Sequence, residues 1–265
     1  MTERYAVIGN PVAHSKSPWI HAEFARACGQ DMEYSRIEAP PGGFAAAVEA
    51  FRAAGGRGLN VTLPFKEEAF RYSARLSARA EPAQAVNTLL FAADVYGDNT
   101  DGVGLVRDLT GNLGFDLKGR NVLLMGAGGA AQGVAGALIE AGIARLVIAN
   151  RTAAKAVSLA ARYPGARGTG YGALEGESFD LAVNATSAGL AGQSPELPRG
   201  VLRRHLLAYD MVYGKDTPFL AAARAAGARA CDGTGMLVEQ AAESFFVWRG
   251  VRPQTRAVLA RLRAA

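Results

Sequence analysis

The chain has few cysteines and histidines and no long apolar run. Its 265 residues include only Cys28 and Cys231, which are far apart and outside any Cys-x-x-Cys motif, so we expect neither a disulfide framework nor a zinc cluster. The histidines (His14, His21 and His205) lack the spacing of metal ligands, and we expect no bound metal. No apolar run reaches the length of a membrane span, and no signal-peptide pattern precedes the first predicted strand. These features favour a cytoplasmic protein with reduced thiols.

Long runs of one charge are also absent. The net charge is +5, and arginine supplies the excess, because only five of the 29 basic residues are lysine. The arginines are scattered along predicted helices, so no segment is typical of a nucleic-acid-binding or membrane-binding patch. We therefore expect no nucleic-acid or membrane partner and a mild attraction for anionic small molecules. The sequence leaves the oligomeric state open between a monomer and a homodimer.

The most informative stretch is a glycine-rich segment near the middle of the chain. An apolar strand, Val122–Met125, leads into Gly126-Ala127-Gly128-Gly129-Ala130-Ala131 and then into a helix of small residues. This strand, turn and helix are typical of dinucleotide binding, because Gly126 permits a sharp turn and Gly128 lets the backbone approach a pyrophosphate. Ala131 lets helix and strand pack closely, and the N–H groups at the helix start favour phosphate charge. An ordinary tight turn is the alternative for the glycines alone.

A second apolar segment, Ala144–Ala149, indicates which dinucleotide is bound. It ends at Asn150-Arg151-Thr152, where NAD enzymes place an acidic residue for the ribose 2′-hydroxyl. This chain has Arg151 instead, with Lys155 one helical turn later. A guanidinium suits a 2′-phosphate and a carboxylate does not, so we expect NADP(H) as the cofactor. The alternative is that Arg151 is a solvated cation at a helix start.

The length of the chain suits two domains, and the first hundred residues alternate strand and helix patterns. Such a βαβ pattern predicts a mostly parallel sheet whose ligands lie beyond the C-terminal ends of its strands. We therefore expect an α/β protein with an N-terminal, mostly parallel substrate domain (1–101) and a Rossmann-type NADP-binding domain (102–235). The remaining segment, 236–265, is predicted to be helical.

Polar residues gather at one edge of the predicted N-terminal sheet. Each alone has an ordinary explanation, Ser17 as the N-cap of a helix and Lys66 as a surface cation in a first helical turn, for example. Their shared edge makes a common site the better explanation. They are Ser15, Ser17, Asn60, Thr62, Lys66, Asn87, Thr88, Asn99, Thr100 and Asp101.

The same residues belong to segments that resemble the shikimate dehydrogenase family. These segments are NPVAHSKSP at 10–18, NVTLPFK at 60–66, AVNT at 85–88, DNTDG at 98–102, the glycine turn at 126–131, NRT at 150–152, NATSAG at 184–189 and GTGMLVEQAAESF at 233–245. The resemblance covers nearly the whole chain in the family's order. It implies an NADP-linked enzyme of aromatic amino-acid biosynthesis that interconverts 3-dehydroshikimate and shikimate. It also implies that the helices of 236–265 return to the first domain.

The resemblance also assigns roles. Lys66 and Asp101 form the expected catalytic pair, in which Lys66 is the best candidate to exchange the hydroxyl proton while Asp101 holds its ammonium group. Which of the two moves the proton stays open. Expected substrate-binding residues are Ser15, Ser17 and Tyr213 near the carboxylate and Asn60, Thr62, Asn87 and Gln240 near the ring hydroxyls. Met211 and Gly233 map to positions near the nicotinamide.

The chain departs from the family pattern at two positions. Ala78 stands where many members carry an acid near the cofactor, so no role is carried over there. Gln84 replaces the glycine that usually precedes Ala-Val-Asn-Thr, which leaves the local turn uncertain.

Other functions remain as alternatives. A quinate or quinate/shikimate dehydrogenase of broader specificity is the nearest, and the paired serines with Asn-Arg-Thr favour shikimate and NADP over it. A non-catalytic NADP-binding regulator would not need both Lys66 and Asp101. A bare Rossmann binding module would not explain the first hundred residues.

Overall fold

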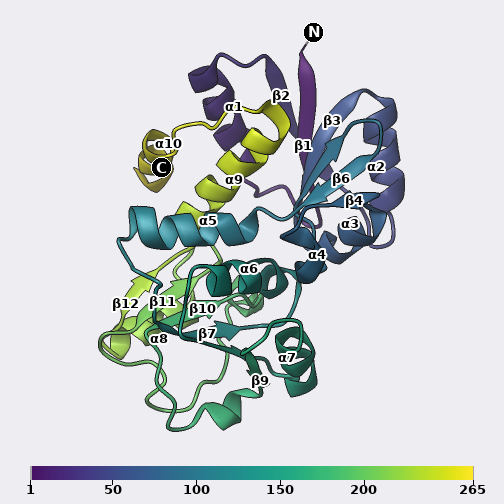
Figure 1. Cartoon of the computed structure of the whole chain (residues 1–265). Coiled ribbons are helices and arrows are strands. Elements are labelled where there is room, and N and C mark those ends of the chain that lie inside the picture. Colours follow the sequence, from purple (N-terminus) through teal and green to yellow (C-terminus); the bar gives the residue numbers. More distant parts are fainter. Residues whose placement is uncertain (1, 265) are drawn as a thin grey trace. The chain divides into compact units, whose positions relative to one another are not determined.

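The computed structural model of the protein describes residues 2–264, apart from the side chains of residues 190 and 191. The chain divides into two compact units, one comprising the chain up to Gly104 and again from Val238, the other comprising Leu105–Leu237. Within the described residues, each unit contains one six-stranded sheet with helices packed on it (Figure 1). The predicted α/β class is confirmed.

The first unit is built on a mixed sheet with strand order β2-β1-β3-β5-β6-β4. Strand β1 is parallel to β2 and β3, and β4 is parallel to β6, whereas β5 is antiparallel to both β3 and β6 because β5 and β6 form a hairpin. The strands are β1 (Glu3–Gly9), β2 (Met32–Glu38), β3 (Gly56–Val61), β4 (Arg75–Leu76), β5 (Thr88–Phe91) and β6 (Val95–Asp98). The helices are α1 (Ser17–Cys28), α2 (Phe44–Ala53), α3 (Lys66–Tyr72), α4 (Ala80–Ala83) and α10 (Arg256–Ala264).

Two helices contain the points at which the chain passes from one unit to the other. These are α5 (Asp101–Arg107), which continues as a π-helical turn at Asp108–Asn112, and α9 (Thr234–Arg249). The C-terminal part of α9 packs within the first unit. There the Trp248 ring stacks on Tyr5 of β1 with centroids 4.7 Å apart, and its indole N–H donates to the Leu89 carbonyl oxygen at 3.0 Å.

The second unit has a fully parallel sheet with strand order β12-β11-β10-β7-β8-β9. Counted within this unit the order is 3-2-1-4-5-6, that of dinucleotide-binding folds, in which the strand order reverses between the first strand and the fourth. The strands are β7 (Asn121–Met125), β8 (Arg145–Ala149), β9 (Arg167–Thr169), β10 (Leu181–Asn184), β11 (Leu207–Asp210) and β12 (Arg229–Cys231). The helices are α6 (Gly129–Glu140), α7 (Ala153–Ala160) and α8 (Pro218–Ala225).

Alternation along the strands divides the second unit's core into two layers. Leu124 and Ile148 pack with the apolar residues of α6 and α7, whereas Leu123 and Val147 pack with those of α8. Neighbouring residues of a strand point to opposite faces, so apolar strands of this kind need helices on both sides. This arrangement places the loops that follow β7 and β8 at one edge of the sheet.

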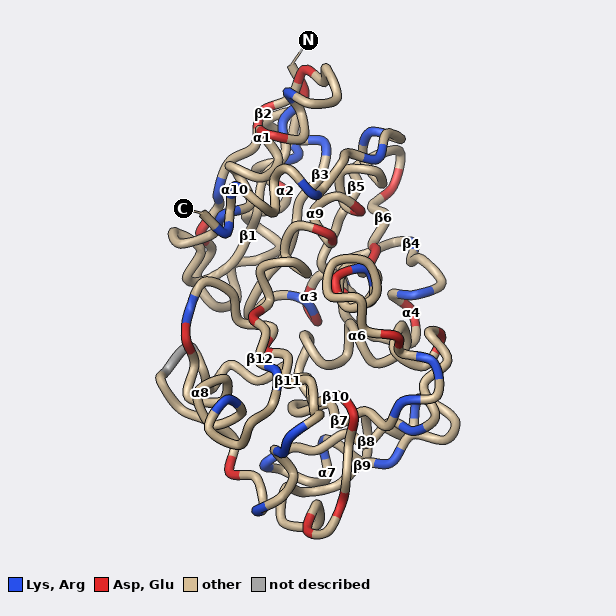
Figure 2. The backbone as a smooth tube through the Cα atoms, turned by 90° about the vertical axis from the view of Figure 1, so that its left-hand side faces the viewer, with Lys and Arg blue, Asp and Glu red and all other residues tan. Residues whose placement is uncertain are grey.

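Charged residues are distributed over both units. Figure 2 shows Lys and Arg positions interspersed with Asp and Glu along the backbone. In the part of the chain that the structure describes, no helix is both long enough and apolar enough to span a membrane.

One glycine of the second unit marks a close approach of strand and helix. A Cβ atom at Gly168 in β9 would overlap the backbone of Ala156 and Val157 in α7. Gly170, directly after the same strand, has room, since its Cβ would lie 3.6 Å from the Ala153 Cβ.

We expect Gly168→Ala to lower the free energy of unfolding by about 1–3 kcal/mol, because backbone atoms of α7 have to move. The matched variant Gly170→Ala changes only an ordinary van der Waals contact, so we expect an effect within about 0.5 kcal/mol. Urea unfolding followed by circular dichroism measures both. Equal midpoints for the two variants would contradict the close packing of α7 on β9.

Candidate active site

Lys66 and Asp101 form an ion pair in the first unit. Lys66 is the first residue of α3 and Asp101 the first residue of α5, so each follows the end of a sheet strand by a short connection. Lys66 Nζ donates to Asp101 Oδ2, with side chains that are 13% and 6% exposed. Partial burial strengthens a charge-assisted hydrogen bond relative to one in water. The structure thus joins two residues that the sequence places 35 positions apart.

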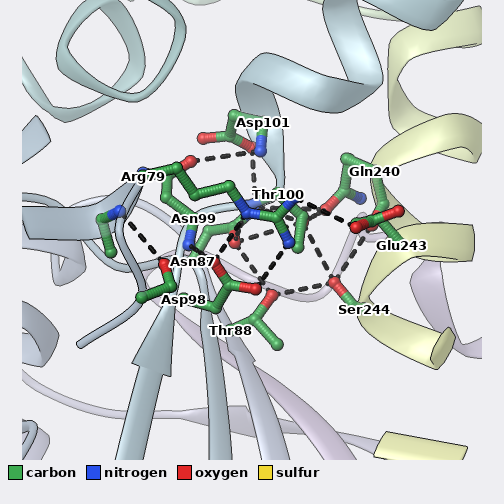
Figure 3. Close-up of polar contacts among 12 residues, drawn as sticks. Arg79, Asn87, Thr88, Asp98, Asn99, Thr100, Asp101, Gln240, Glu243 and Ser244 are labelled. Atoms are coloured by element: carbon green, nitrogen blue, oxygen red, sulfur yellow. Dashed lines mark hydrogen bonds and ion pairs between the residues drawn. The ribbon is translucent and has the colours of Figure 1, made fainter. Parts of the chain in front are cut away.

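Asn87 holds the other oxygen of this carboxylate. Its Nδ2 atom donates to Asp101 Oδ1 at 2.8 Å and to Thr100 Oγ1 at 2.9 Å, and it lies 3.3 Å from Gln240 Oε1. Its Oδ1 atom accepts from the Thr100 backbone N–H at 2.8 Å. Figure 3 shows Asn87 between Asp101 and the side chains of α9. Lys66 and Asn87 therefore each hold one oxygen of Asp101 and fix the orientation of its side chain.

Asn60 belongs to a second group of buried polar side chains. Its Nδ2 atom donates to Ser244 Oγ at 2.8 Å and to Thr88 Oγ1 at 3.2 Å, while its Oδ1 accepts from the Tyr34 hydroxyl at 2.7 Å. Ser244 Oγ also lies 3.1 Å from Thr100 Oγ1, which connects the two groups. The donors of Asn60 are thus directed at protein acceptors, and its Oδ1 keeps one lone pair for a further donor.

Ser15 and Ser17 lie together at the start of α1 and are both buried. Ser17 N–H donates to Ser15 Oγ at 3.3 Å, and Arg36 Nη2 donates to the Ser15 carbonyl at 2.6 Å. The prediction that Ser17 is the N-cap of this helix is wrong. Ser17 is the first helical residue, Lys16 occupies the cap position in the right-handed helical conformation, and no side-chain cap bond is made there. The Ser15 hydroxyl instead accepts from the first N–H group of the helix, so Ser15 and not Ser17 satisfies a free backbone donor there.

Two further candidates differ in how far the structure ties them to this group. The Oε1 atom of Gln240 lies 3.3 Å from Asn87 Nδ2 and 3.4 Å from Thr100 Oγ1. Thr62 follows β3 and is half-buried; its N–H donates to the Ile8 carbonyl at 2.9 Å, and its methyl group lies where a side chain at Gly9 would be.

Two side chains of this region were absent from the predicted site. Tyr34 and Ser244 each bond to Asn60. Ser244 stands four residues after Gln240, so the helical period that places both on one face was the available signal. No pattern in the sequence singles out Tyr34.

In the second unit, the glycine turn has the geometry of a phosphate-binding loop. Gly126 adopts a φ of 108°, and a Cβ there would lie 3.1 Å from the Ala185 carbonyl oxygen, so only glycine fits. Gly128 is extended and exposed at the cap of the 12-residue helix α6, and no described atom lies within 4 Å of its Cβ position. Ala127, Gly129 and Ala130 are partly exposed around the helix start. The turn therefore presents backbone N–H groups to an anion.

The end of β8 carries the predicted 2′-phosphate residues. Arg151, Thr152 and Lys155 are all exposed, and Thr152 occupies the N-cap position of α7 without a side-chain cap bond. Asn150 Nδ2 donates to the Thr152 carbonyl at 3.0 Å, which fixes the turn. Burial raises the pKa of Tyr171 to about 12, and the nearby Arg151 cation acts in the opposite direction. Arg151 and Lys155 thus form a positive edge beside the glycine turn.

Met211, Tyr213 and Gly233 lie in the segments that follow β11 and β12. All three belong to the second unit. Gly233 donates its N–H to the Val212 carbonyl at 3.0 Å and has no room for a Cβ, because the Met211 backbone fills that position. Met211 and Tyr213 are half-buried. Among the residues that the structure describes, no cluster of His, Cys, Asp or Glu could hold a metal ion.

Comparison with known proteins agrees with this geometry. The family model described as "Shikimate dehydrogenase substrate binding domain" matches residues 7–89, "Shikimate / quinate 5-dehydrogenase" matches 108–189, and "Shikimate 5'-dehydrogenase C-terminal domain" matches 233–263. A curated shikimate dehydrogenase (NADP(+)) from Chromobacterium violaceum is 56% identical over 269 residues, covering 99% of this chain and 98% of the relative. This chain belongs to the shikimate dehydrogenase family.

Solved structures of similar proteins support the same assignment. An Ael1 enzyme from Pseudomonas putida is 51% identical with a TM-score of 0.92, covering 98% of both chains. Shikimate 5-dehydrogenase from Thermus thermophilus, solved in complex with NADP(H) and shikimate, is 36% identical with a TM-score of 0.88, covering 99% of both chains. The predicted shikimate dehydrogenase family and two-domain α/β fold are confirmed.

The structure also explains one departure from the family pattern. Gln84, at the position where shikimate dehydrogenases usually have glycine, adopts a φ of 53° at the end of α4. Glycine reaches this left-handed conformation without steric cost, whereas glutamine does not. Gln84 therefore forms the kind of turn that favours glycine, and Asn87 follows three residues later.

A buried histidine lies beneath the polar group. The His21 ring is fully buried and stacks on the Tyr34 ring, with centroids 4.2 Å apart and planes 5° apart. Neither ring nitrogen has a hydrogen-bond partner among the described residues. Burial lowers the pKa of His21 to about 3, with the neighbouring Asn60 amide acting weakly in the opposite direction. The ring is therefore neutral in the folded protein.

This histidine should make the fold acid-sensitive. Between pH 6.5 and pH 3 the unfolded chain binds a proton at His21 that the folded chain does not, so stability falls as the pH falls through this window. His21→Phe keeps an aromatic ring and removes the titrating group. Between pH 7.5 and pH 4.5 we expect the free energy of unfolding of the wild type to fall by about 2–3 kcal/mol more than that of His21→Phe. Urea unfolding of both proteins across this range measures the difference. Parallel profiles would show that His21 titrates normally.

Proposed function

We propose that this chain catalyses the reversible, NADP(H)-linked reduction of 3-dehydroshikimate to shikimate, a step toward chorismate and the aromatic amino acids. The observation that carries the proposal is the Lys66–Asp101 ion pair, held on its far side by Asn87, in a chain that is 56% identical to an NADP-dependent relative. We assign substrate binding to residues 1–101, cofactor binding to 102–235, and support of the substrate domain to 236–265.

The substrate is a cyclic carboxylate with several hydroxyl groups, and the chain offers matching partners. The Ser15 and Ser17 hydroxyls would donate to the carboxylate, with Tyr213 as a further donor. Thr62, Asn87 and Gln240 would meet the ring hydroxyls, together with the remaining acceptor of Asn60. The contact between Asn87 and Gln240 is the longest that Asn87 Nδ2 makes, at 3.3 Å, so it is the one that a substrate hydroxyl would replace.

Lys66 and Asp101 would handle the proton of the reacting hydroxyl. Lys66 Nζ carries three N–H groups, and its bond to Asp101 leaves others to contact the substrate oxygen. In reduction Lys66 Nζ would donate a proton to the carbonyl oxygen, and in oxidation it would take the proton back. Asp101 would orient Lys66 and hold its charge, while Asn87 keeps the carboxylate from rotating.

The residues of the second unit fit NADP(H). Gly126, Gly128 and the start of α6 leave room for a pyrophosphate against the backbone, and Arg151 and Lys155 offer charge to a 2′-phosphate. Asn150 and Thr152 would line the same phosphate, and Met211 and Gly233 would lie near the nicotinamide. When bound, the nicotinamide supplies or accepts the hydride.

The setting of the enzyme is part of the proposal. Cys28 and Cys231 are both thiols, which supports a cytoplasmic location. A monomer and a homodimer are equally compatible with the proposal, since every residue named here lies in one chain, and light scattering distinguishes them. Turnover of quinate at a rate similar to shikimate would favour the broader quinate/shikimate activity.

The direct test follows reduced-nicotinamide absorbance with shikimate and NADP+, for the wild type, Lys66→Ala and Lys118→Ala. Removing the proton-exchanging ammonium group should lower kcat by roughly 10²–10⁴-fold. Lys118 is an exposed lysine of the second unit, so Lys118→Ala should keep wild-type kcat. Activity that survives in Lys66→Ala would refute the proton-transfer role, and absence of turnover in the wild type would refute the proposed function.

Arg151 provides a separate test of cofactor choice. Arg151→Ala should weaken NADP+ binding by roughly tenfold or more, because a charge-assisted bond to phosphate is lost, and should leave NAD+ binding unchanged. Isothermal titration calorimetry with each nucleotide measures this without turnover, and NAD+ acts as the internal control. Equal losses for both nucleotides would assign Arg151 to the folding of the loop and not to the 2′-phosphate.

A further inference from the structure

Arg79 lies between two buried carboxylates that come from different elements of the first unit. Its Nε and Nη2 atoms donate to the two oxygens of Asp98 at 2.8 and 2.6 Å, and its Nη1 donates to Glu243 Oε1 at 3.0 Å. The Asp98 and Glu243 side chains are 3% and 8% exposed. Arg252 binds the other Glu243 oxygen at 2.5 Å. The charges thus alternate along a chain of four side chains.

Each of these carboxylates adjoins a part of the proposed active site. Asp98 ends β6 just before Asn99-Thr100-Asp101, and its carbonyl accepts from the Asn87 N–H at 3.0 Å. Glu243 lies one helical turn after Gln240 on α9 and is followed directly by Ser244. The Arg79 guanidinium therefore links the segment that delivers Asp101 to the helix that delivers Gln240 (Figure 3).

The packing of α5 on α9 sets the smallest distance that these two helices can have. A Cβ at Gly104, three residues after Asp101, would lie 2.8 Å from the Gln240 backbone nitrogen and 3.0 Å from its Cα. The two helices are thus as close there as a glycine allows. The ion pairs of Arg79 prevent α9 from moving away, so steric contact and charge together fix Gln240.

We propose that Arg79 is a positioning residue that sets the place of Gln240 relative to Asn87 and Asp101, and thereby the affinity for substrate. The inference rests on the proposed function through the substrate-binding role of Gln240. A planar guanidinium can bind one carboxylate with two N–H groups and a second carboxylate with a third, whereas a lysine ammonium is a point charge without this fork. Charge alone at position 79 is therefore insufficient.

The chain contains a matched control at the other end of β6. Arg75 binds both oxygens of Asp94, at 2.7 and 2.9 Å, but these side chains are 60% and 39% exposed and contact none of the proposed site residues through this pair. Arg75→Lys thus changes the same kind of Arg–Asp pair beside the same strand. A surface pair of this sort contributes little to stability.

The experiment compares Arg79→Lys with Arg75→Lys by steady-state kinetics with shikimate. Arg79→Lys should raise KM for shikimate by roughly tenfold, as expected when a binding group is displaced by a fraction of an ångström, and leave the Kd for NADP+ unchanged. Arg75→Lys should leave both constants unchanged. Glu243→Gln, which removes the charge at the α9 end of the bridge, should raise KM in the same direction. A KM at the wild-type value in both Arg79→Lys and Glu243→Gln would overturn the inference.

A double variant separates positioning from a general loss of stability. In a Gln240→Ala background the Arg79→Lys change should raise KM by less than about twofold, because the side chain that Arg79 positions is gone. An undiminished effect in that background, or a parallel loss of NADP+ affinity, would show that Arg79 supports the fold and not Gln240. Failure of the proposed function is distinct, since the wild type itself would then not turn over shikimate.

Discussion

The site of the first unit depends on a buried carboxylate that must be neutralised and hydrogen-bonded. An unpaired charge at Asp101 would cost several kcal/mol, so Lys66 and Asn87 each take one of its oxygens. The hairpin makes this possible, because the β5–β6 register places Thr88 opposite Asp98 and so brings the residues just before β5 next to those just after β6. Asn87 and Thr100 then bond to one another directly. Strand pairing thus fixes the distance between Asn87 and the segment that carries Thr100 and Asp101.

The second unit obeys a different constraint, which is close approach of backbone to ligand. The turn after β7 combines a positive φ at Gly126 with an open, extended Gly128, and it lies beside β10, where the strand order reverses. Here the side chains are small and the binding groups are backbone N–H groups, so affinity depends on conformation more than on residue chemistry. The charges of Arg151 and Lys155, as proposed, would distinguish one nucleotide from another.

Much of the fold and part of the site could be predicted from the sequence. Apolar periodicity placed the long strands and helices, and polar residues at strand ends indicated a shared edge, within which the family resemblance indicated the Lys66–Asp101 pair. Short strands such as β4, which has two residues, are too short to show an alternation of apolar and polar residues and could not be predicted. The Arg79–Glu243 ion pair joins residues 164 positions apart, and nothing in the sequence around an arginine indicates so distant a partner. The cap assignment of Ser17 failed because Lys16 is already in a helical conformation, which side-chain propensity does not reveal.

The polar groups of the first unit are largely satisfied by one another before any ligand binds, and this bears on specificity. Asn60, Asn87 and Ser244 already exchange hydrogen bonds with threonine, tyrosine and glutamine side chains. A ligand therefore gains affinity only where it replaces such a bond with one at least as good. A polyol with hydroxyls at the right positions can do so, whereas an analogue that displaces such a bond without replacing it would leave a buried amide or hydroxyl unpaired, which discriminates strongly against that analogue. Because the exchange needs each partner held in place, Arg79, which bonds to Asp98 and Glu243, would share in this selection by holding Gln240.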